Sequence, residues 1–297
     1  MKLFSILRSP NQMPALRKAG ADGILLGIKG LSYRIDTFTL EEAILILQEA
    51  KLIGLDVYLS LNRLLDEDDC ETALTFINQI AHVGFSGIYF QDLAYTDFCK
   101  GKSINLIYAP EAIITSSKEV EALCSNSIDR VMAAKELTLE EVLTMAENNP
   151  NKVEIFGFGH LPMSVSRRPL IANYLEDRKL DPQLNKGRGL RLKEEKRSVF
   201  YPILEDEKET VIFSDTVFCV LNEIKSLSDH GVFAIIADDL FVEEEMLTEF
   251  IRACRSVMDG KDPRIELKRL QDLAPDDLFS SGYFYKKTNL TKESVNL

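Results

Sequence analysis

The chain has 297 residues, of which 45% are apolar and 28% are charged, and its formal net charge is −12. This composition is typical of a soluble globular protein with a large core. No apolar run reaches the roughly 18 residues that a membrane helix needs, and the N-terminus lacks the cleavage site of a signal peptide, so we expect a cytoplasmic protein with no membrane partner. The negative charge repels phosphate backbones on average, although a local basic face remains compatible with it.

Five cysteines are scattered along the chain without a C-x-x-C pair: Cys70, Cys99, Cys124, Cys219 and Cys254. Their odd number and wide spacing argue against a disulfide framework and against a self-contained zinc site. We interpret them as reduced, buried thiols.

Short β-rich segments alternate with amphipathic helical segments from the N-terminus onward. Strands are predicted at residues 2–7, 23–27, 57–61, 87–90, 104–108, 128–132 and 153–156, and a later one at 232–236. Helices are predicted at 14–20, 39–54, about 69–84, 92–100, 139–148 and 243–258. The clearest boundaries belong to 39–54, because Thr39 is a plausible N-cap, Glu42 follows three residues later, and Gly54 is a stop signal.

Repetition of βα units predicts a parallel sheet covered by helices. Eight units would close a (β/α)8 TIM-like barrel, which is the fold we predict; an open doubly wound sheet is the alternative, disfavoured because no G-x-G-x-x-G follows a strand. We assign 1–260 to the barrel. An insertion of about sixty residues separates units seven and eight. Within the barrel domain we assign residues 176–213 to this insertion and predict hairpin strands near 198–204 and 210–213. Residues 261–297 form a C-terminal extension with a short helix at 266–273.

Reactive groups of a (β/α)8 barrel gather at the C-terminal ends of its strands. The residues just past each predicted strand form a polar ring of both charge signs, which suits an anionic or zwitterionic small ligand. Its members are Arg8, Ser9, Lys29, Arg34, Asn62, Gln91, Asp92, Glu111, Lys135, Glu136, residues 158–160, Asp238 and Asp239. The candidate ligand-binding residues are Lys29, Arg34, Asn62, Gln91, Lys135 and, beyond the seventh strand, Arg168.

The candidate catalytic residues are His160, Glu136 and Asp92. His160 follows Gly-Phe-Gly directly after the seventh predicted strand, where an imidazole can act as a general base or ligand. Asp92 begins a predicted helix, so its alternative role is that of a helix cap. The chain has no G-x-S-x-G elbow and no H-E-x-x-H motif, and we expect the adjacent Asp238 and Asp239 to point to opposite faces of a strand. The spacing therefore gives no complete catalytic motif and predicts no metal site.

A basic segment at 179–197 concentrates lysines and arginines between acidic neighbours. It is interpreted either as a solvated loop or as a contact for RNA or another anionic ligand.

Residues 153–175, VEIFGFGHLPMSVSRRPLIANYL, resemble without a gap the signature of peptidase family U32, the collagenase-like peptidases. Members of that family usually read like LEVFVHGALCISYSGRCLLSNYL. LRKAGADGILLGIKGLSYR, VYLSLNRLLDEDD, IYFQDLAY and DRVMAAKELTLEEV are similar to further family blocks. The resemblance covers about residues 3–173, with a weaker match at 213–228, and the family name implies a peptidase.

The chain departs from the family pattern at its cysteines. Some members carry a four-iron iron–sulfur cluster on four cysteines and serve in hydroxylation of ubiquinone precursors or of the tRNA wobble uridine. The resemblance places two of these ligands at Pro162 and Pro169 and a third near Gly189, so that Cys219 alone keeps a thiol. Because one thiolate cannot hold a cluster that needs about four, the resemblance implies that the cluster is absent. Phe158 stands at the position of the family's histidine, two residues before His160.

Three functions are compatible with these observations. The first is a clusterless auxiliary subunit that acts with a cluster-bearing paralogue in tRNA wobble-uridine hydroxylation; its partners would be that paralogue and tRNA. The second is a hydrolase, as the family name says. The third is a barrel that binds an anionic metabolite through Lys29, Arg34 and Lys135.

Overall fold

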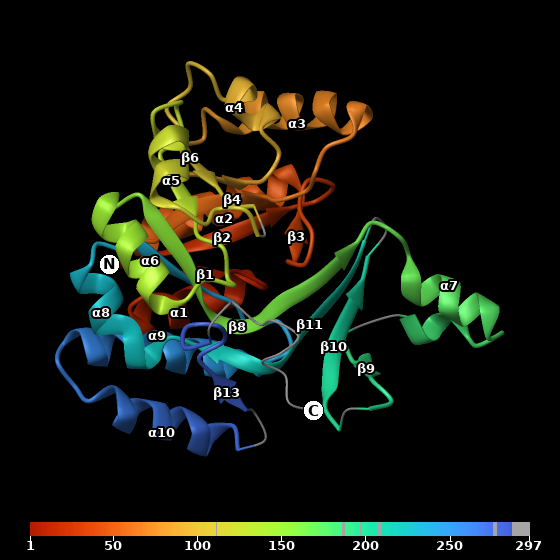
Figure 1. The fold of residues 1–297 in the computed structure, drawn as a ribbon. Helices are drawn as coiled ribbons and strands as arrows, with labels where there is room; N and C mark the ends of the chain where they lie inside the picture. Colours follow the sequence, from red (N-terminus) through yellow and green to blue (C-terminus); the bar gives the residue numbers. More distant parts are fainter. Residues whose placement is uncertain (111, 186–187, 197, 207–208, 276–277, 287–297) are drawn as a thin grey trace.

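The computed structural model describes residues 1–110, 112–185, 188–196, 198–206, 209–275 and 278–286. Eight parallel strands close into a barrel because the last of them, β12, pairs with both β1 and β8 (Figure 1). The barrel strands are β1 (Lys2–Ile6), β2 (Gly23–Ile28), β4 (Asp56–Leu61), β5 (Gly87–Phe90), β6 (Asn105–Tyr108), β7 (Arg130–Met132), β8 (Val153–Ser166) and β12 (Ala234–Ala237). This closure confirms the predicted (β/α)8 barrel and excludes the open sheet.

Helices follow the strands and cover the outside of the barrel. They are α1 (Met13–Ala19), α2 (Leu40–Ile53), α3 (Glu67–Ile80), α4 (Ala94–Phe98), α5 (Ser117–Cys124), α6 (Leu139–Asn148), α8 (Ile224–Asp229) and α9 (Glu244–Met258). The α2 boundaries have the predicted cause: Thr39 and Glu42 form a capping box, and Gly54 ends the helix with a φ of +73°. Helix α5 was missing from the predicted elements, and Ser116 caps it.

The barrel strands separate two apolar cores because successive side chains of a strand point to opposite faces. One core lies inside the barrel and consists of Phe4, Leu25, Tyr58, Tyr89, Ile107, Ala234 and Ile236. The larger core lies between the strands and the helices, where residues such as Ile24 and Leu59 meet Ile46 and Leu47 of α2. The barrel interior is therefore packed, and only its upper layer borders the cavity described below.

Strand β8 continues beyond the barrel, so the predicted end at Phe156 is wrong. Its first residues pair with β7 and β12, and its second half pairs antiparallel with β11 (Thr210–Cys219). Two glycines allow the strand to leave the barrel without ending. A Cβ on Gly157 would overlap the side chain of Ile235, and Gly159 has a φ of +126° with the backbone oxygen of Asp238 only 2.6 Å from where a Cβ would lie.

The extended part of β8 belongs to a projection that we call the arm, the described residues of 159–219. It contains α7 (Leu170–Asp177), a 3-10 turn (Pro182–Asn185), β9 (Arg191–Lys193), β10 (Phe200–Glu205) and β11. The strand order β8-β11-β10-β9 makes it an antiparallel sheet, and α7 lies at its far end (Figure 1). The predicted hairpin near 198–204 and 210–213 corresponds to β10 and β11, whereas the excursion from the barrel begins before residue 176.

Three ion pairs hold the arm against loops at the barrel mouth. Asp206 lies 3.1 Å from Arg63, Glu209 lies 3.5 Å from Arg34, and Arg188 lies 2.7 Å from Asp36. The barrel partners follow β2 and β4 directly, so the arm leans over that side of the mouth.

The C-terminal region packs onto the same body. Helix α10 (Pro263–Leu273) contributes Leu270 to the larger core, and β13 (Phe279–Ser280) pairs with β11. A short strand, β3 (Thr37–Phe38), pairs with β2. Within the described ranges, no helix combines the length and the apolar character needed to cross a bilayer.

Candidate functional site

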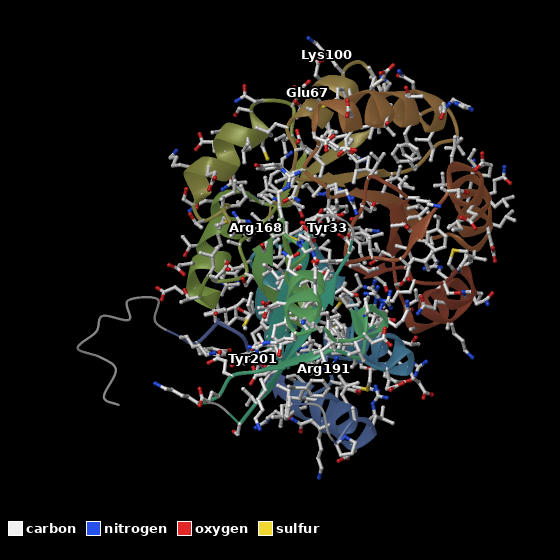
Figure 2. All side chains as sticks on the ribbon, turned by 90° about the vertical axis from the view of Figure 1, so that its right-hand side faces the viewer. Tyr33, Glu67, Lys100, Arg168, Arg191 and Tyr201 are labelled. Carbon is white, nitrogen blue, oxygen red and sulfur yellow. The ribbon has the colours of Figure 1, made fainter. Side chains whose placement is uncertain are left out.

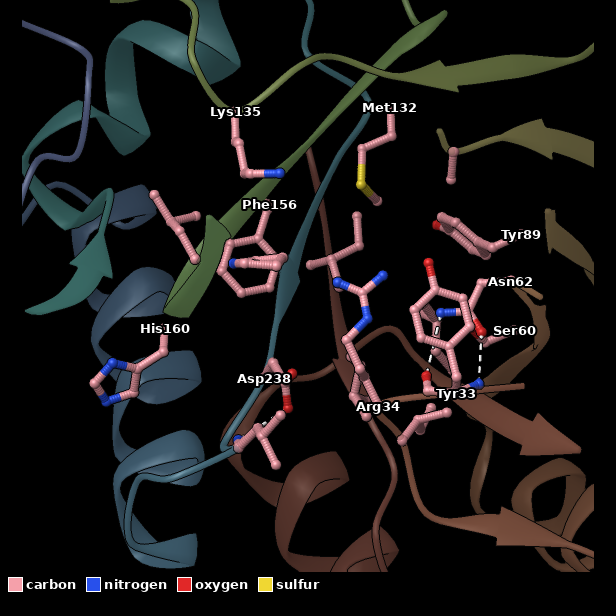
Figure 3. A pocket seen from close by; sticks show the side chains of 18 of the residues that line it. Tyr33, Arg34, Ser60, Asn62, Tyr89, Met132, Lys135, Phe156, His160 and Asp238 are labelled. Atoms are coloured by element: carbon pink, nitrogen blue, oxygen red, sulfur yellow. Dashed lines mark hydrogen bonds between the residues drawn. The ribbon is translucent and has the colours of Figure 1, made fainter. Parts of the chain in front are cut away.

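A cavity of about 130 Å³ opens at the C-terminal ends of the barrel strands (Figure 3). One water needs about 10–15 Å³, so the cavity has room for a small ligand. Its floor is apolar and comes from the strands: Ile6, Leu25, Tyr89, Met132, Phe156 and Ile236. Its roof comes partly from the arm, which supplies Leu161, Pro162 and Phe213. The site is therefore enclosed by two parts of the chain that are distant in sequence.

Two cationic side chains line this cavity. The Arg34 guanidinium lies 4.1 Å from the centre of the Tyr33 ring and is 9% exposed, and Lys135 is 13% exposed. Figure 3 shows the Arg34 guanidinium pointing into the middle of the cavity and Lys135 entering from the opposite edge of the view. Arg34 also has a φ of +59°, a conformation that is uncommon for residues other than glycine. Each cation also lies near a carboxylate, Arg34 3.5 Å from Glu209 and Lys135 3.8 Å from Glu136, so charges of both signs surround the apolar floor.

A hydrogen-bonded group fixes the loop that carries Arg34. Asn62 clamps the backbone of Tyr33, because its Oδ1 accepts from Tyr33 N at 3.1 Å and its Nδ2 donates to Tyr33 O at 3.3 Å. Gln91 donates to the Tyr33 hydroxyl at 2.9 Å and to the backbone oxygen of Asn62. Asn62 therefore lines the cavity while positioning Tyr33, and Gln91 supports both residues from behind.

His160 lines the cavity from inside strand β8 rather than from a loop after it. Its Nδ1 lies 2.6 Å from the backbone oxygen of Ser214. A carbonyl can only accept, so Nδ1 carries the proton in this contact and a neutral imidazole presents Nε2 as its acceptor. Ser214 stands at an irregularity between β8 and β11, and its hydroxyl accepts from Leu161 N at 2.9 Å. The bulge thus fixes the tautomer of His160.

Arg8 joins three carboxylates beside the cavity. It donates to Asp238 and to Asp239, and its third nitrogen lies 3.2 Å from Asp36. Burial alone would lower the pKa of Arg8, but the charges of Asp238 and Asp239 outweigh it and raise that pKa. The expectation that Asp238 and Asp239 point apart is wrong, because β12 ends at Ala237 and both carboxylates reach one guanidinium. The pair is engaged in an ion-pair cluster.

A second polar group lies inside the barrel below the cavity. Glu154, which is completely buried, accepts from Arg130 at 2.5 Å and from the Tyr89 hydroxyl at 2.5 Å. Arg130 also donates to the Tyr58 hydroxyl at 3.2 Å and lies over the Phe233 ring at 4.2 Å. The charged and hydroxyl groups of this network hydrogen-bond to one another, so we interpret the network as a structural element of the barrel interior.

The structure places several other predicted residues outside the cavity lining. Lys29 is exposed on the loop after β2, and Arg168 is exposed on the arm after β8. Asp92 accepts from Leu65 N and Ala94 N, both at 3.0 Å, which makes it a cap and loop anchor. Glu136 lies 3.8 Å from Lys135. Glu111 of the polar ring falls outside the described residues. Of the predicted ring and site residues, the cavity thus brings together Arg34, Asn62, Lys135, His160 and Asp238.

Sequence reasoning missed several residues of the cavity. Ser60 and Tyr89 lie two positions before Asn62 and Gln91 on their strands, and all line this cavity or the adjoining crevice. The period of two along a strand could have identified them, because residues i and i−2 share a face. Phe213 and Leu240 reach the roof through long-range pairing, for which the local sequence carries no signal.

The family cysteine positions lie on or beside the arm. Pro162 lines the cavity, Pro169 precedes α7, and Gly189 is exposed. Cys219 is buried at the end of β11, and burial raises the pKa of its thiol to about 12. Among the described residues, no three His, Cys, Asp or Glu side chains gather in a metal-binding arrangement.

The fold and site define a TIM-like barrel protein with an antiparallel arm against its mouth. The profile of peptidase family U32 matches residues 8–294, and the chain therefore belongs to peptidase family U32. The family expected from the signature at 153–175 is confirmed.

Three relatives place the chain within this family. It is 25% identical over 291 residues to tRNA hydroxylation protein P2 of Bacillus subtilis, covering 92% of this chain and 94% of the relative. It is 26% identical over 179 residues to a collagenase of Porphyromonas gingivalis, covering 56% and 43%. With tRNA hydroxylation protein P1 of Bacillus subtilis, the identity is 23% over 163 residues, covering 54% and 39%. A solved structure, the U32 peptidase Mk0906, is 12% identical with a TM-score of 0.49 over 80% of this chain and 92% of that one.

Proposed function

We propose that this chain is a clusterless auxiliary subunit that acts with a cluster-bearing U32 paralogue in hydroxylation of the tRNA wobble uridine. The match to tRNA hydroxylation protein P2 carries the proposal, because it spans 92% of this chain and 94% of the relative. The matches to protein P1 and to the collagenase each cover less than half of the relative. Since P1 and P2 occur in one organism, two U32 paralogues in one modification pathway are a reasonable arrangement.

The absence of a cluster is proposed from the donor atoms at the family positions. Pro162, Pro169 and Gly189 have no side-chain donor, and a cluster of this type needs four thiolates. The remaining thiol, Cys219, is buried and has a pKa raised to about 12, so its protonated form is favoured at neutral pH. The redox chemistry would then belong to the paralogue.

In this role the residues of the cavity bind and orient rather than oxidise. Arg34 and Lys135 would attract an anionic group, and the apolar floor would accept an uncharged body. His160, with its Nδ1 proton held by Ser214, would offer Nε2 as a hydrogen-bond acceptor.

Deletion of the gene tests the proposal. We expect mass analysis of tRNA from the deletion strain to show loss of hydroxylated wobble uridine, and a plasmid copy to restore it. An unchanged modification profile would contradict the proposal.

The iron content of the protein tests the absence of a cluster. Anaerobically purified protein is expected to contain no stoichiometric iron and to have no visible absorption band; a brown, absorbing sample would refute the assignment at Pro162 and Pro169.

A hydrolase is a second candidate, favoured by the match to the collagenase over 179 residues. It predicts that the purified chain cleaves gelatin or peptides without a partner. A variant with His160→Gln serves as the matched control, because cleavage by a contaminating protease would be unaffected by it. Equal rates for both proteins would count against a hydrolase.

An anion-binding barrel is a third candidate, favoured by the cavity's two cations and apolar floor. It predicts that small carboxylates raise the melting temperature, since a ligand at about 100 times its Kd adds about 2.7 kcal/mol of stability. The shift should disappear in Arg34→Gln and persist in Lys29→Gln, because Lys29 lies outside the cavity lining. No shift with any carboxylate would exclude this candidate.

A further inference from the structure

One segment of the arm, residues 167–197, carries positive charge on a chain that is otherwise acidic, whereas residues 198–219 of the arm carry more acidic than basic residues. Residues 167–197 contain ten lysines and arginines against five aspartates and glutamates, a net charge of about +5, whereas the whole chain has −12. The remaining residues therefore total about −17. A local basic surface of this kind attracts phosphate even when the molecule as a whole repels it.

Aromatic rings lie among these charges on the exposed side of the arm. Tyr174 of α7 is 56% exposed, and the guanidinium of Arg178 lies 5.7 Å from its ring centre. Phe200 of β10 is 55% exposed, and Lys193 of β9 lies 5.1 Å from its ring centre. Exposed rings beside cations are the combination that binds RNA, since bases stack on the rings while the cations contact phosphates.

The basic surface leads to the cavity. The guanidinium of Arg191 lies 5.2 Å from the ring of Phe241, which in turn lies 6.0 Å from the His160 ring and 5.0 Å from Phe213. Arg167 lines a crevice between the arm and the mouth, together with Tyr33 and Gln91. Figure 2 faces the arm and shows Arg168 and Arg191 at different heights along it.

We propose that the arm is a tRNA-binding surface, which contacts the phosphate backbone through Arg178, Lys179 and Lys193 and stacks unpaired bases on Tyr174 and Phe200. This proposal rests on the proposed function, because it names the part of the chain that holds its RNA partner. A strand bound along the arm would place one nucleotide beside the mouth of the barrel. Exposed Leu170, Leu184 and Leu192 offer an alternative use of the same surface, as a face for a protein partner.

Titration of fluorescent tRNA tests the proposal on the purified full chain, alone and with its paralogue. The variant is Arg178→Gln/Lys179→Gln/Lys193→Gln, which spares Arg188 and Arg191 because these bind Asp36 and the arm backbone. We expect about tenfold weaker binding and a slope of log Kd against log salt that is lower by about 2–3, about one for each lost phosphate contact. The control is Lys51→Gln/Lys118→Gln/Lys225→Gln, which removes the same charge from exposed positions on α2, α5 and α8.

A second pair of variants separates stacking from charge. Tyr174→Ala/Phe200→Ala should weaken binding of single-stranded tRNA regions by about five- to 150-fold for each base stacked, which corresponds to about 1–3 kcal/mol per base, with the salt slope unchanged. Circular dichroism of each variant confirms that it is folded.

Three results would overturn the proposal. The first is equal tRNA affinity and salt slope for the arm triple variant and its control. The second is an arm variant that keeps its tRNA affinity but loses the paralogue in gel filtration, which would make the arm a protein-docking face. The third is full wobble-uridine hydroxylation in a deletion strain complemented with the arm variant. The first two outcomes leave the proposed function untouched. An unchanged tRNA modification profile in the deletion strain itself would refute that function, independently of the arm.

Discussion

The interior of the barrel and the surface of the arm differ in where their polar and apolar groups lie. Inside the barrel, Glu154 is completely buried and its charge is matched by Arg130 and a tyrosine hydroxyl. On the arm, Met163, Tyr174 and Phe200 are 48%, 56% and 55% exposed. Buried polar groups that pair within the protein need no further partner, whereas exposed rings and charges on a projection are suited to contact with another molecule. The proposed RNA contact therefore falls on the arm, whereas the largest effects on stability are expected in the barrel.

The largest effect is expected from the buried pair of the barrel. Glu154→Ala leaves Arg130 buried without its partner, so the free energy of unfolding should fall by about 3–5 kcal/mol. Urea unfolding measures the change. The double variant Arg130→Met/Glu154→Leu, which removes both charges, should recover much of the loss, and a double variant as unstable as the single one would show that the network is more than an ion pair.

A smaller effect is expected where β8 leaves the barrel. Gly157→Ala places a methyl group against Ile235, and overpacking of this kind costs about 1–3 kcal/mol. Gly189→Ala on the arm is the control, because nothing lies within 4 Å of the added carbon, and its effect should stay within about 0.5 kcal/mol. Equal melting temperatures for both variants would mean that β8 bends for another reason.

The smallest effect on stability is expected from the ion pairs that hold the arm. Arg63→Gln removes the contact with Asp206, a partly exposed pair worth about 0–1 kcal/mol. Hydrogen exchange should nevertheless become faster in β10 and β11, because the arm opens locally without unfolding the barrel. Lys118→Gln, which breaks an exposed pair with Glu121 on α5, should leave exchange in the arm unchanged. Slower or equal hydrogen exchange in Arg63→Gln would show that the ion pair between Arg63 and Asp206 is not needed to hold the arm against the barrel.

The sequence was sufficient for the barrel because its information is local. The capping box of Thr39 and Glu42 set the start of α2, and the β5 residues 87–90 were placed correctly from their apolar run. Strand β8 was cut short because Gly157 and Gly159 are usually signals of a turn, whereas here they bend a continuing strand. The residues around these glycines do not show whether the strand ends in a turn or bends and continues.

The site could be predicted in part. Arg34, Asn62, Lys135 and His160 were identified because they lie at or beyond strand ends, which the barrel brings together. Asp92 and Lys29 met the same criterion and lie elsewhere, since position along a strand does not determine whether a side chain points inward or caps a helix. The joint binding of Arg8 by Asp238 and Asp239, and the arm's contribution to the roof, depend on pairing between residues far apart in sequence.

The proposed auxiliary role requires that the chain support tRNA hydroxylation without a thiolate at the one family cysteine position it keeps, Cys219. The most direct test is mass analysis of wobble uridine in a deletion strain complemented with Cys219→Ala, compared with wild-type protein at equal abundance. We predict that both restore hydroxylation to the same level, because Cys219 is a buried core thiol. Restoration by wild-type protein but not by a folded Cys219→Ala variant would contradict the account.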